Sequence, residues 1–245
     1  MKTDPILQQI DRDGFAVLAA VFESREIETT LHGLETAFQT QQDSAIRSEA
    51  GHIYAARNLL STWPAAAALW QISPLQDVLA DVLGTDCGLV RVLYFDKPPN
   101  QSWGLPWHKD MTIAVRDNRL PSERFGKPTQ KAGVPHVEAP SELLERMLTA
   151  RIHLDTVTEE NGPLKVLPGS HRAAKALSNG AVKPQTILVE RGDVLLIRPL
   201  VEHCSSRSHP NTARHRRILH LEFAADRELP DGYAWHDFMP ATSHD

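Results

Sequence analysis

The sequence has few cysteines, no long apolar run and no surplus of positive charge. Its two cysteines, Cys87 and Cys204, are too few for a disulfide framework, which favours a reducing compartment. No run of about eighteen apolar residues occurs and the N-terminus lacks an apolar leader, so neither a transmembrane helix nor a secretory signal is expected. With 26 basic and 31 acidic residues the net charge is −5, which argues against a nucleic-acid or membrane partner. We expect a soluble, cytoplasmic protein.

No internal repeat or low-complexity segment is present, and 41% hydrophobic and 23% charged residues are ordinary globular composition. We expect one domain over residues 1–245. Residues up to about 85 predict a layer of helices, with apolar positions at spacings of three and four. Residues of about 86–225 predict many short strands separated by Gly and Pro, which is typical of a cupin-like jelly roll. The fold class expected is therefore mainly β with flanking helices.

Residues of about 116–140 contain four prolines and two glycines and show no periodicity. A connection of this length without regular structure inside a compact domain is usually functional and often covers a binding site. We therefore predict a lid here.

The motif with the most chemical content is Trp107-His108-Lys109-Asp110, together with the distant His203. Successive side chains of a strand point to opposite faces, so His108 and Asp110 are expected on one face of an extended segment over 108–115. Two histidines and one carboxylate form the facial triad that binds non-haem Fe(II) and leaves coordination positions open. The sequence thus suggests a metal centre.

The motif is short, and the sequence contains rivals for it. A second His-x-Asp pair, His153-Leu154-Asp155, could supply the same two ligands. The pattern favours the first pair without excluding the second. His203 is the favoured distal ligand because it follows an apolar strand that begins after a Gly-Asp turn. Its rivals are His209, His215 and His220.

Several segments in a fixed order resemble the phytanoyl-CoA dioxygenase family, whose members are Fe(II)- and 2-oxoglutarate-dependent oxygenases built on a double-stranded β-helix. The segments span residues of about 10 to 225 and comprise Phe95-Asp96-Lys97-Pro98, Trp107-His108-Lys109-Asp110, Glu160-Asn161-Gly162-Pro163-Leu164, Val166-Leu167-Pro168-Gly169-Ser170-His171, Gly192-Asp193-Val194, His203 and Arg216-Arg217. The resemblance implies that His108, Asp110 and His203 hold the metal, because family ligands precede the long lid segment. His153 and Asp155 then line the pocket or serve the structure.

The resemblance also implies residues that bind 2-oxoglutarate. Arg suits the far carboxylate because its planar fork makes two parallel hydrogen bonds. Of Arg214, Arg216 and Arg217, the family position is Arg216, although alternation along the strand does not choose between Arg216 and Arg217. Ser205, two residues after His203, matches a family Ser/Thr that hydrogen-bonds the same carboxylate. Three further residues match co-substrate positions less closely: Leu93, Arg57 and Arg151, the last at a position where related enzymes have Trp.

The resulting hypothesis is an Fe(II)/2-oxoglutarate dioxygenase that uses O2 to hydroxylate a small organic molecule, with release of succinate and CO2. Related halogenases have Ala or Gly at the position of Asp110, so halogenation is not expected. The alternatives are a cupin-like metal-binding protein and a metal-dependent isomerase or hydrolase without 2-oxoglutarate. The substrate itself cannot be inferred. Trp107, Arg116 and His136 are candidates to contact it.

Overall fold

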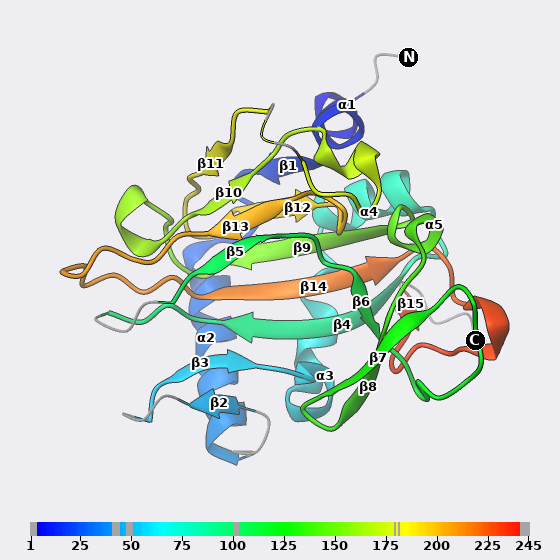
Figure 1. The fold of residues 1–245 in the computed structure, drawn as a ribbon. Helices are drawn as coiled ribbons and strands as arrows, with labels where there is room; N and C mark the ends of the chain where they lie inside the picture. Colours follow the sequence, from blue (N-terminus) through cyan, green and yellow to red (C-terminus); the bar gives the residue numbers. More distant parts are fainter. Residues whose placement is uncertain are drawn as a thin grey trace.

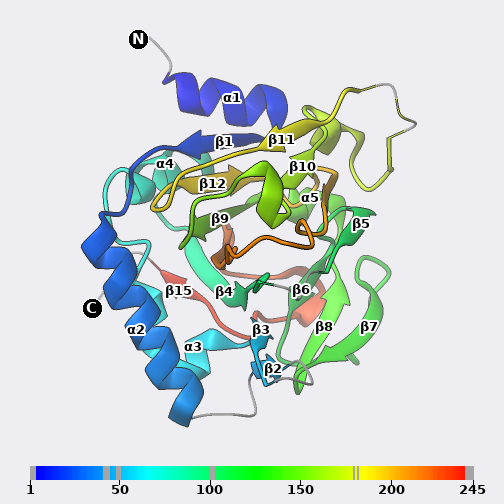
Figure 2. The same ribbon diagram turned by 90° about the vertical axis from the view of Figure 1, so that its left-hand side faces the viewer.

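The structure is a computed structural model that describes residues 4–40, 45–47, 51–99, 103–178, 180 and 182–240, with only the backbone described at 45–47. Its core consists of two facing β-sheets with helices on one side (Figures 1 and 2). The helices are α1 (Pro5–Asp13), α2 (Ser24–Thr40), α3 (Leu59–Thr62), α4 (Leu75–Leu83) and α5 (Ser141–Leu144), with short 3-10 turns η2 (Pro64–Ala68), η3 (Glu159–Asn161), η4 (Ser170–Ala173) and η5 (Pro230–Gly232).

The main sheet has the strand order β1-β12-β9-β14-β4-β3-β2, and β15 also pairs with β4. Its strands are β1 (Phe15–Leu18), β12 (Val194–Ile197), β9 (Met147–His153), β14 (Ile218–Ala224), β4 (Gly88–Phe95), β3 (Ile53–Ala56), β2 (Ala45–Arg47) and β15 (Met239–Pro240). The smaller facing sheet has the order β11-β10-β13-β5, formed by β11 (Gln185–Ile187), β10 (Leu164–Val166), β13 (His203–Ser205) and β5 (Leu105–His108). The predicted jelly roll with flanking helices is confirmed.

The two faces of the main sheet differ in chemistry. On β9, residues 148, 150 and 152 are apolar and pack in one hydrophobic cluster with residues of α2 and α4. The alternate residues 149, 151 and 153 are Thr, Arg and His, and all three are buried. Because alternate side chains of a strand point to opposite faces, this polar row faces the smaller sheet. A row of buried polar side chains, one of them an arginine, where a core would otherwise form indicates a site between the sheets.

The helical layer follows the apolar spacing of the sequence. In α2, Ile27, Leu34 and Phe38 are buried, and Figure 2 shows this helix on the side of the main sheet away from β5 and β10. Helix α1 ends at Gly14, whose φ of 84° is a left-handed C-cap. A Cβ there would lie 2.5 Å from His171 Nδ1, so glycine also permits the packing of η4.

Two expectations about the middle of the chain are wrong. The segment 108–115 is not one strand, because β5 ends at His108 and β6 (Thr112–Ala114) belongs to another sheet. Residues 116–140 are not irregular throughout, because β7 (Gly126–Lys131) and β8 (Val134–Glu138) form a hairpin that joins β6 in a three-stranded sheet. Both views place this three-stranded sheet close to β3 and β4 of the main sheet (Figures 1 and 2).

Candidate metal centre and adjoining cavities

The structure brings His108, Asp110 and His203 together between the two sheets. His108 lies opposite His203 in the pairing of β5 with β13, and their ring centroids are 4.3 Å apart. Asp110 follows where the chain leaves β5, and its backbone N–H donates to Pro199 O at 2.9 Å. The Asp110 oxygens lie 3.9 Å from His108 Nε2 and 3.6 Å from His203 Nε2. Among the described residues, these three form the one group of three potential ligands that lie within reach of a single ion.

Hydrogen bonds orient both imidazoles. His108 Nδ1 lies 2.8 Å from Pro106 O, and His203 Nδ1 lies 2.9 Å from Val201 O. A carbonyl only accepts, so each Nδ1 carries a proton, and each Nε2, which faces Asp110, is the nitrogen available to a metal. Burial lowers the pKa of His203 to about 4, against the attraction of Asp110. A neutral imidazole is the form that binds a metal. The donor set therefore suits a divalent cation.

Residues around the triad hold its backbone in place. Lys109 points away from Asp110, and its ammonium donates to Ser170 O at 2.9 Å and Ala174 O at 2.6 Å. The Ser170 hydroxyl accepts from the backbone N–H of Glu202 at 2.8 Å, immediately before His203. The turn at η4 thereby fixes both ligand-bearing segments.

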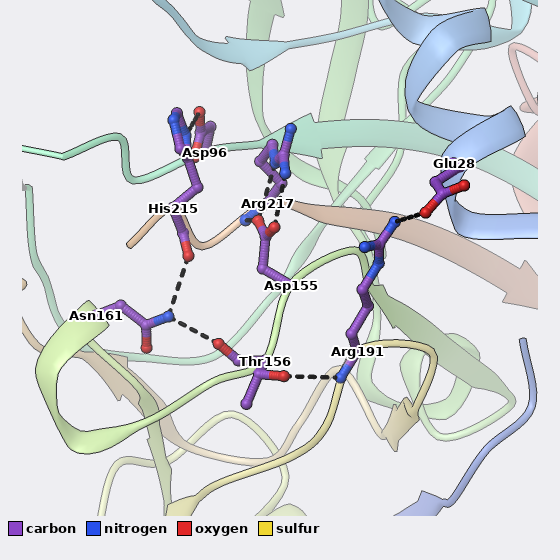
Figure 3. A network of polar contacts seen from close by, with 8 residues as sticks. All are labelled: Glu28, Asp96, Asp155, Thr156, Asn161, Arg191, His215 and Arg217. Atoms are coloured by element: carbon purple, nitrogen blue, oxygen red, sulfur yellow. Dashed lines mark hydrogen bonds and ion pairs between the residues drawn. The ribbon is translucent and has the colours of Figure 1, made fainter. Parts of the chain in front are cut away.

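His153 and Asp155 lie in other surroundings, and Figure 3 shows those of Asp155. Asp155 accepts two hydrogen bonds from the Arg217 guanidinium, at 2.9 and 2.7 Å, within a network that also contains Asp96 and His215. His153 is buried, its Nδ1 lies 3.3 Å from Asp193 O, and burial lowers its pKa to about 3. Asp155 is therefore neutralised by an arginine.

The other histidines do not join the triad. His209 is exposed, and His215 Nδ1 lies 2.9 Å from Asp96 Oδ2. His220 lines the cavity beside the triad, where Arg151 Nε donates to its Nδ1 at 3.2 Å.

Two cavities adjoin the triad. The larger, of about 350 Å³, is lined by Tyr54, Ala55, Arg57, Arg91, Leu93, Phe95, Trp103, Leu105, His108, Asp110, Thr112, Lys131, Arg151, His203, His220 and Glu222. The smaller, of about 30 Å³, is lined by Phe95, Trp103, Leu105, Arg151, Leu164, His203, Ser205, Arg216 and Ile218. Of the expected co-substrate residues, Arg216 and Ser205 line the small cavity, Leu93 and Arg57 the large one, and Arg151 both.

Arg216 and Arg217 occupy opposite sides of the chain. Arg216 is 4% exposed, and its Nε is buried without a hydrogen-bond partner among the described residues. Burial lowers the pKa of Arg216 to about 9, and the charge of Arg151 acts in the same direction. A buried guanidinium with an unused donor, next to a space of carboxylate size, fits an anionic ligand.

Lys97 is also part of this site, a role that the sequence pattern did not indicate. Its side chain is fully buried, and its ammonium donates to Ser205 Oγ at 2.5 Å and to the carbonyls of Gly162 and Ser206. Burial, followed by the charges of Arg216 and Arg151, lowers the pKa of Lys97 to about 6. Gly162, with φ of 72°, permits this approach, because a Cβ there would lie 2.5 Å from Ser206 O. The family-like Asn-Gly-Pro-Leu segment is the signal that could have indicated Lys97.

The three expected substrate contacts do not line either cavity. Trp107 alternates with His108 on β5 and is 36% exposed. Arg116 is exposed and lines a surface groove with Asp117 and Arg119. His136 is buried behind the cavity, where burial and then the charge of Arg91 lower its pKa to about 4. Lys131, from the same segment as Arg116 and His136, does line the larger cavity.

A family model described as phytanoyl-CoA dioxygenase (PhyH) matches residues 10–218. The chain belongs to the phytanoyl-CoA dioxygenase family. It is thus a non-haem Fe(II)- and 2-oxoglutarate-dependent dioxygenase, and the described donor set fits the iron site of such an enzyme. No curated protein matches the sequence. Within the described residues, no helix has the length and apolarity required to cross a bilayer.

Solved structures of similar fold share little sequence with this dioxygenase. EctD from S. alaskensis, in a structure with bound Fe, has a TM-score of 0.68 at 20% identity, with 91% of this chain and 78% of that chain covered. SnoK, a carbocyclase from nogalamycin biosynthesis, has a TM-score of 0.67 at 14% identity, with 94% and 88% covered. EvdMO1 has a TM-score of 0.64 at 21% identity, with 89% covered, and this chain spans only 49% of its length. At these identities the likeness shows the fold alone.

Proposed function

We propose that this dioxygenase hydroxylates a small organic molecule and releases succinate and CO2, with iron held by His108, Asp110 and His203. The observation that carries the proposal is the pairing of this triad with a buried, partly unpaired Arg216 at a cavity of carboxylate size. Bound iron and 2-oxoglutarate together supply the activation of O2. The protein contributes ligation, orientation and exclusion of water.

Arg216 and Ser205 are suited to hold the far carboxylate of 2-oxoglutarate. Arg216 supplies donors inside a site with little water, where a charge-assisted hydrogen bond is strongest. The Ser205 hydroxyl oxygen accepts a hydrogen bond from Lys97 Nζ and keeps its own O–H as a donor for an anion. Leu93 lies on β4 on the wall of the larger cavity, and Arg151 lines both cavities beside the triad. The co-substrate would thus lie between the triad and Arg216, leaving the larger cavity for substrate.

The test is anaerobic titration of the iron-loaded protein with 2-oxoglutarate, monitored by the metal-to-ligand charge-transfer band. We expect the band in the wild type and in Arg217→Lys, whose side chain pairs with Asp155 on the outer side. Asp110→Ala, which lacks one of the three proposed iron ligands, should not form the band. An intact, iron-loaded wild type that develops no band would refute the proposed function.

A further inference from the structure

The larger cavity has a second cluster of positive charge at the end remote from Arg216. Arg57 follows β3, Arg91 lies on β4 and Lys131 ends β7, and all three line the larger cavity but not the smaller one. With Arg151 they make four cations in the lining, against two carboxylates, Asp110 and Glu222. Because Asp110 belongs to the candidate metal centre, Glu222 is left to neutralise the cluster.

Glu222 satisfies Arg91 only in part, by accepting one hydrogen bond from its Nη1. The two residues are neighbours across the pairing of β4 with β14, yet Arg91 Nη1 lies 3.3 Å from Glu222 Oε1, and that oxygen also lies 3.3 Å from His220 Nε2. The Arg91 side chain is 7% exposed, and its Nε is buried without a hydrogen-bond partner among the described residues. A guanidinium has five N–H donors, and a buried unpaired donor is costly. Arg91 therefore has donors available to a ligand.

Arg57 and Lys131 form no ion pair with a described carboxylate, although the more distant charge of Glu222 acts on both. Lys131 donates to the neutral hydroxyl of Thr112 at 2.7 Å. Arg57 is half-buried and makes no hydrogen bond or ion pair with another described residue. Burial, followed by the charges of Arg91 and Arg57, lowers the pKa of Lys131, so the three cations are close enough to repel one another. Such an arrangement is stabilised when an anion joins it.

We propose that Arg57, Arg91 and Lys131 bind a carboxylate or phosphate group of the substrate and thereby direct the rest of the molecule toward the triad. The inference rests on the proposed function, since it assigns the substrate class of the same site. It also explains why the pocket has two cationic ends: the small cavity at Arg216 suits the co-substrate, and the cluster on the opposite side suits an anionic substrate. The cavity of about 350 Å³ limits that substrate to a small molecule.

The experiment compares four probes of equal chain length: hexanoate, hexyl phosphate, hexanamide and hexylamine. Each is titrated by calorimetry into metal-free protein and into anaerobic protein loaded with Fe(II) and 2-oxoglutarate, while the charge-transfer band is recorded. We expect hexanoate or hexyl phosphate to bind at least about tenfold more tightly than hexanamide and hexylamine, with the band retained. Arg57→Gln and Lys131→Gln should each reduce this preference to less than about threefold. Arg116→Gln, an exposed arginine outside the cavity, is the matched control and should keep it.

Equal affinity for hexanoate, hexyl phosphate and hexanamide would overturn the proposal, and so would an anion preference that both variants retain. Loss of the band on addition of hexanoate would also overturn it, because the carboxylate would then occupy the co-substrate position. The proposed function is judged separately. A wild type that forms no band but keeps an anion preference dependent on Arg57 and Lys131 would refute the oxygenase chemistry and support the anion site.

Discussion

At the scale of single residues, the metal ligands give the sharpest prediction. His108→Ala, Asp110→Ala and His203→Ala should each lose iron binding and iron-dependent succinate formation, because each removes one of three converging donors. The fold should survive. Asp155→Asn is the control, since Asp155 pairs with Arg217 rather than with the triad. Iron content after gel filtration, with circular dichroism for the fold, decides the matter. Loss of iron in Asp155→Asn but not in Asp110→Ala would reverse the assignment.

Arg216 and Arg217 differ in position although they are adjacent. Arg216→Lys should raise the apparent 2-oxoglutarate requirement by at least about tenfold, because a lysine cannot reproduce a bidentate, charge-assisted contact of roughly 1.5–3 kcal/mol. Arg217→Lys should change it little and instead weaken the two hydrogen bonds to Asp155. Titration of 2-oxoglutarate against succinate formation measures both variants. A large effect at Arg217 with none at Arg216 would contradict this placement.

The buried Lys97 is expected to make the free energy of unfolding depend on pH. Its pKa is lowered to about 6 in the folded protein by burial first, against about 10.4 in an unfolded chain. Between these values the unfolded state binds more protons, so the free energy of unfolding should rise with pH, by at most about 1.4 kcal/mol per pH unit from this group. Urea unfolding of wild type and Lys97→Met between pH 6.5 and 9 should show a flatter dependence in the variant. Half-exposed Lys165→Met is the control, and parallel curves for wild type and Lys97→Met would contradict the prediction.

The grouping of His108, Asp110 and His203 could be predicted from the resemblance to known oxygenases, because the His-x-Asp spacing alone left His153 and Asp155 as a rival pair. The partners of the buried charged residues could not be predicted from the sequence. Alternation along a strand left Arg216 and Arg217 equivalent; the structure separates them by pairing Arg217 with Asp155 and placing Arg216 in the lining of the small cavity. Trp107 and Arg116 lie near the candidate ligands in sequence but outside both cavities, because Trp107 alternates with His108 on β5 and Arg116 follows β6 of another sheet.

At the scale of elements, the hairpin of β7 and β8 is the main feature that the sequence did not predict. Its turn places Ala132 and Gly133 at φ of 48° and 79°, both in the left-handed region. Such a turn is normally signalled by Asn-Gly or Asp-Gly, and alanine gives no such signal. Lys127, also at positive φ, precedes Pro128 where the register shifts, which interrupts the alternation of a regular strand. Proline and glycine here mark an irregular hairpin, which the sequence alone presented as a structureless connection.

The same element remains a predicted lid, because β7 is exposed along most of its length while Lys131 reaches the cavity. Binding of iron with N-oxalylglycine, an inert analogue of 2-oxoglutarate, should reduce trypsin cleavage after Arg119, Arg124 and Lys131 as the segment closes. Cleavage after the exposed Arg172, outside the segment, gives the reference rate. Equal cleavage of 116–140 in the free and bound protein would count against closure.

At the scale of the whole molecule, the main sheet pairs strands from the first and last parts of the chain. β1 pairs with β12 and β14 pairs with β4, so the main sheet interleaves residues from 15 to 224. The helices have no separate core, since α2 and α4 share one hydrophobic cluster with β4, β9 and β14. The predicted helical layer of about 1–85 is therefore expected to unfold together with the jelly roll.

Calorimetry tests both the joint unfolding of helices and sheets and the binding of iron and 2-oxoglutarate. We expect a single thermal transition in the free protein, because neither layer can keep its core without the other. Anaerobic Fe(II) and 2-oxoglutarate at about one hundred times their dissociation constants should each stabilise the folded state by about 2.7 kcal/mol, or roughly 5–10 °C in Tm for a domain of this size. Arg216→Lys should retain the shift caused by iron and lose about half of the shift caused by the same concentration of 2-oxoglutarate, because a tenfold weaker affinity leaves about 1.4 kcal/mol. Two separate transitions, with ligands moving only the later one, would instead mean that the helical layer folds as an independent unit.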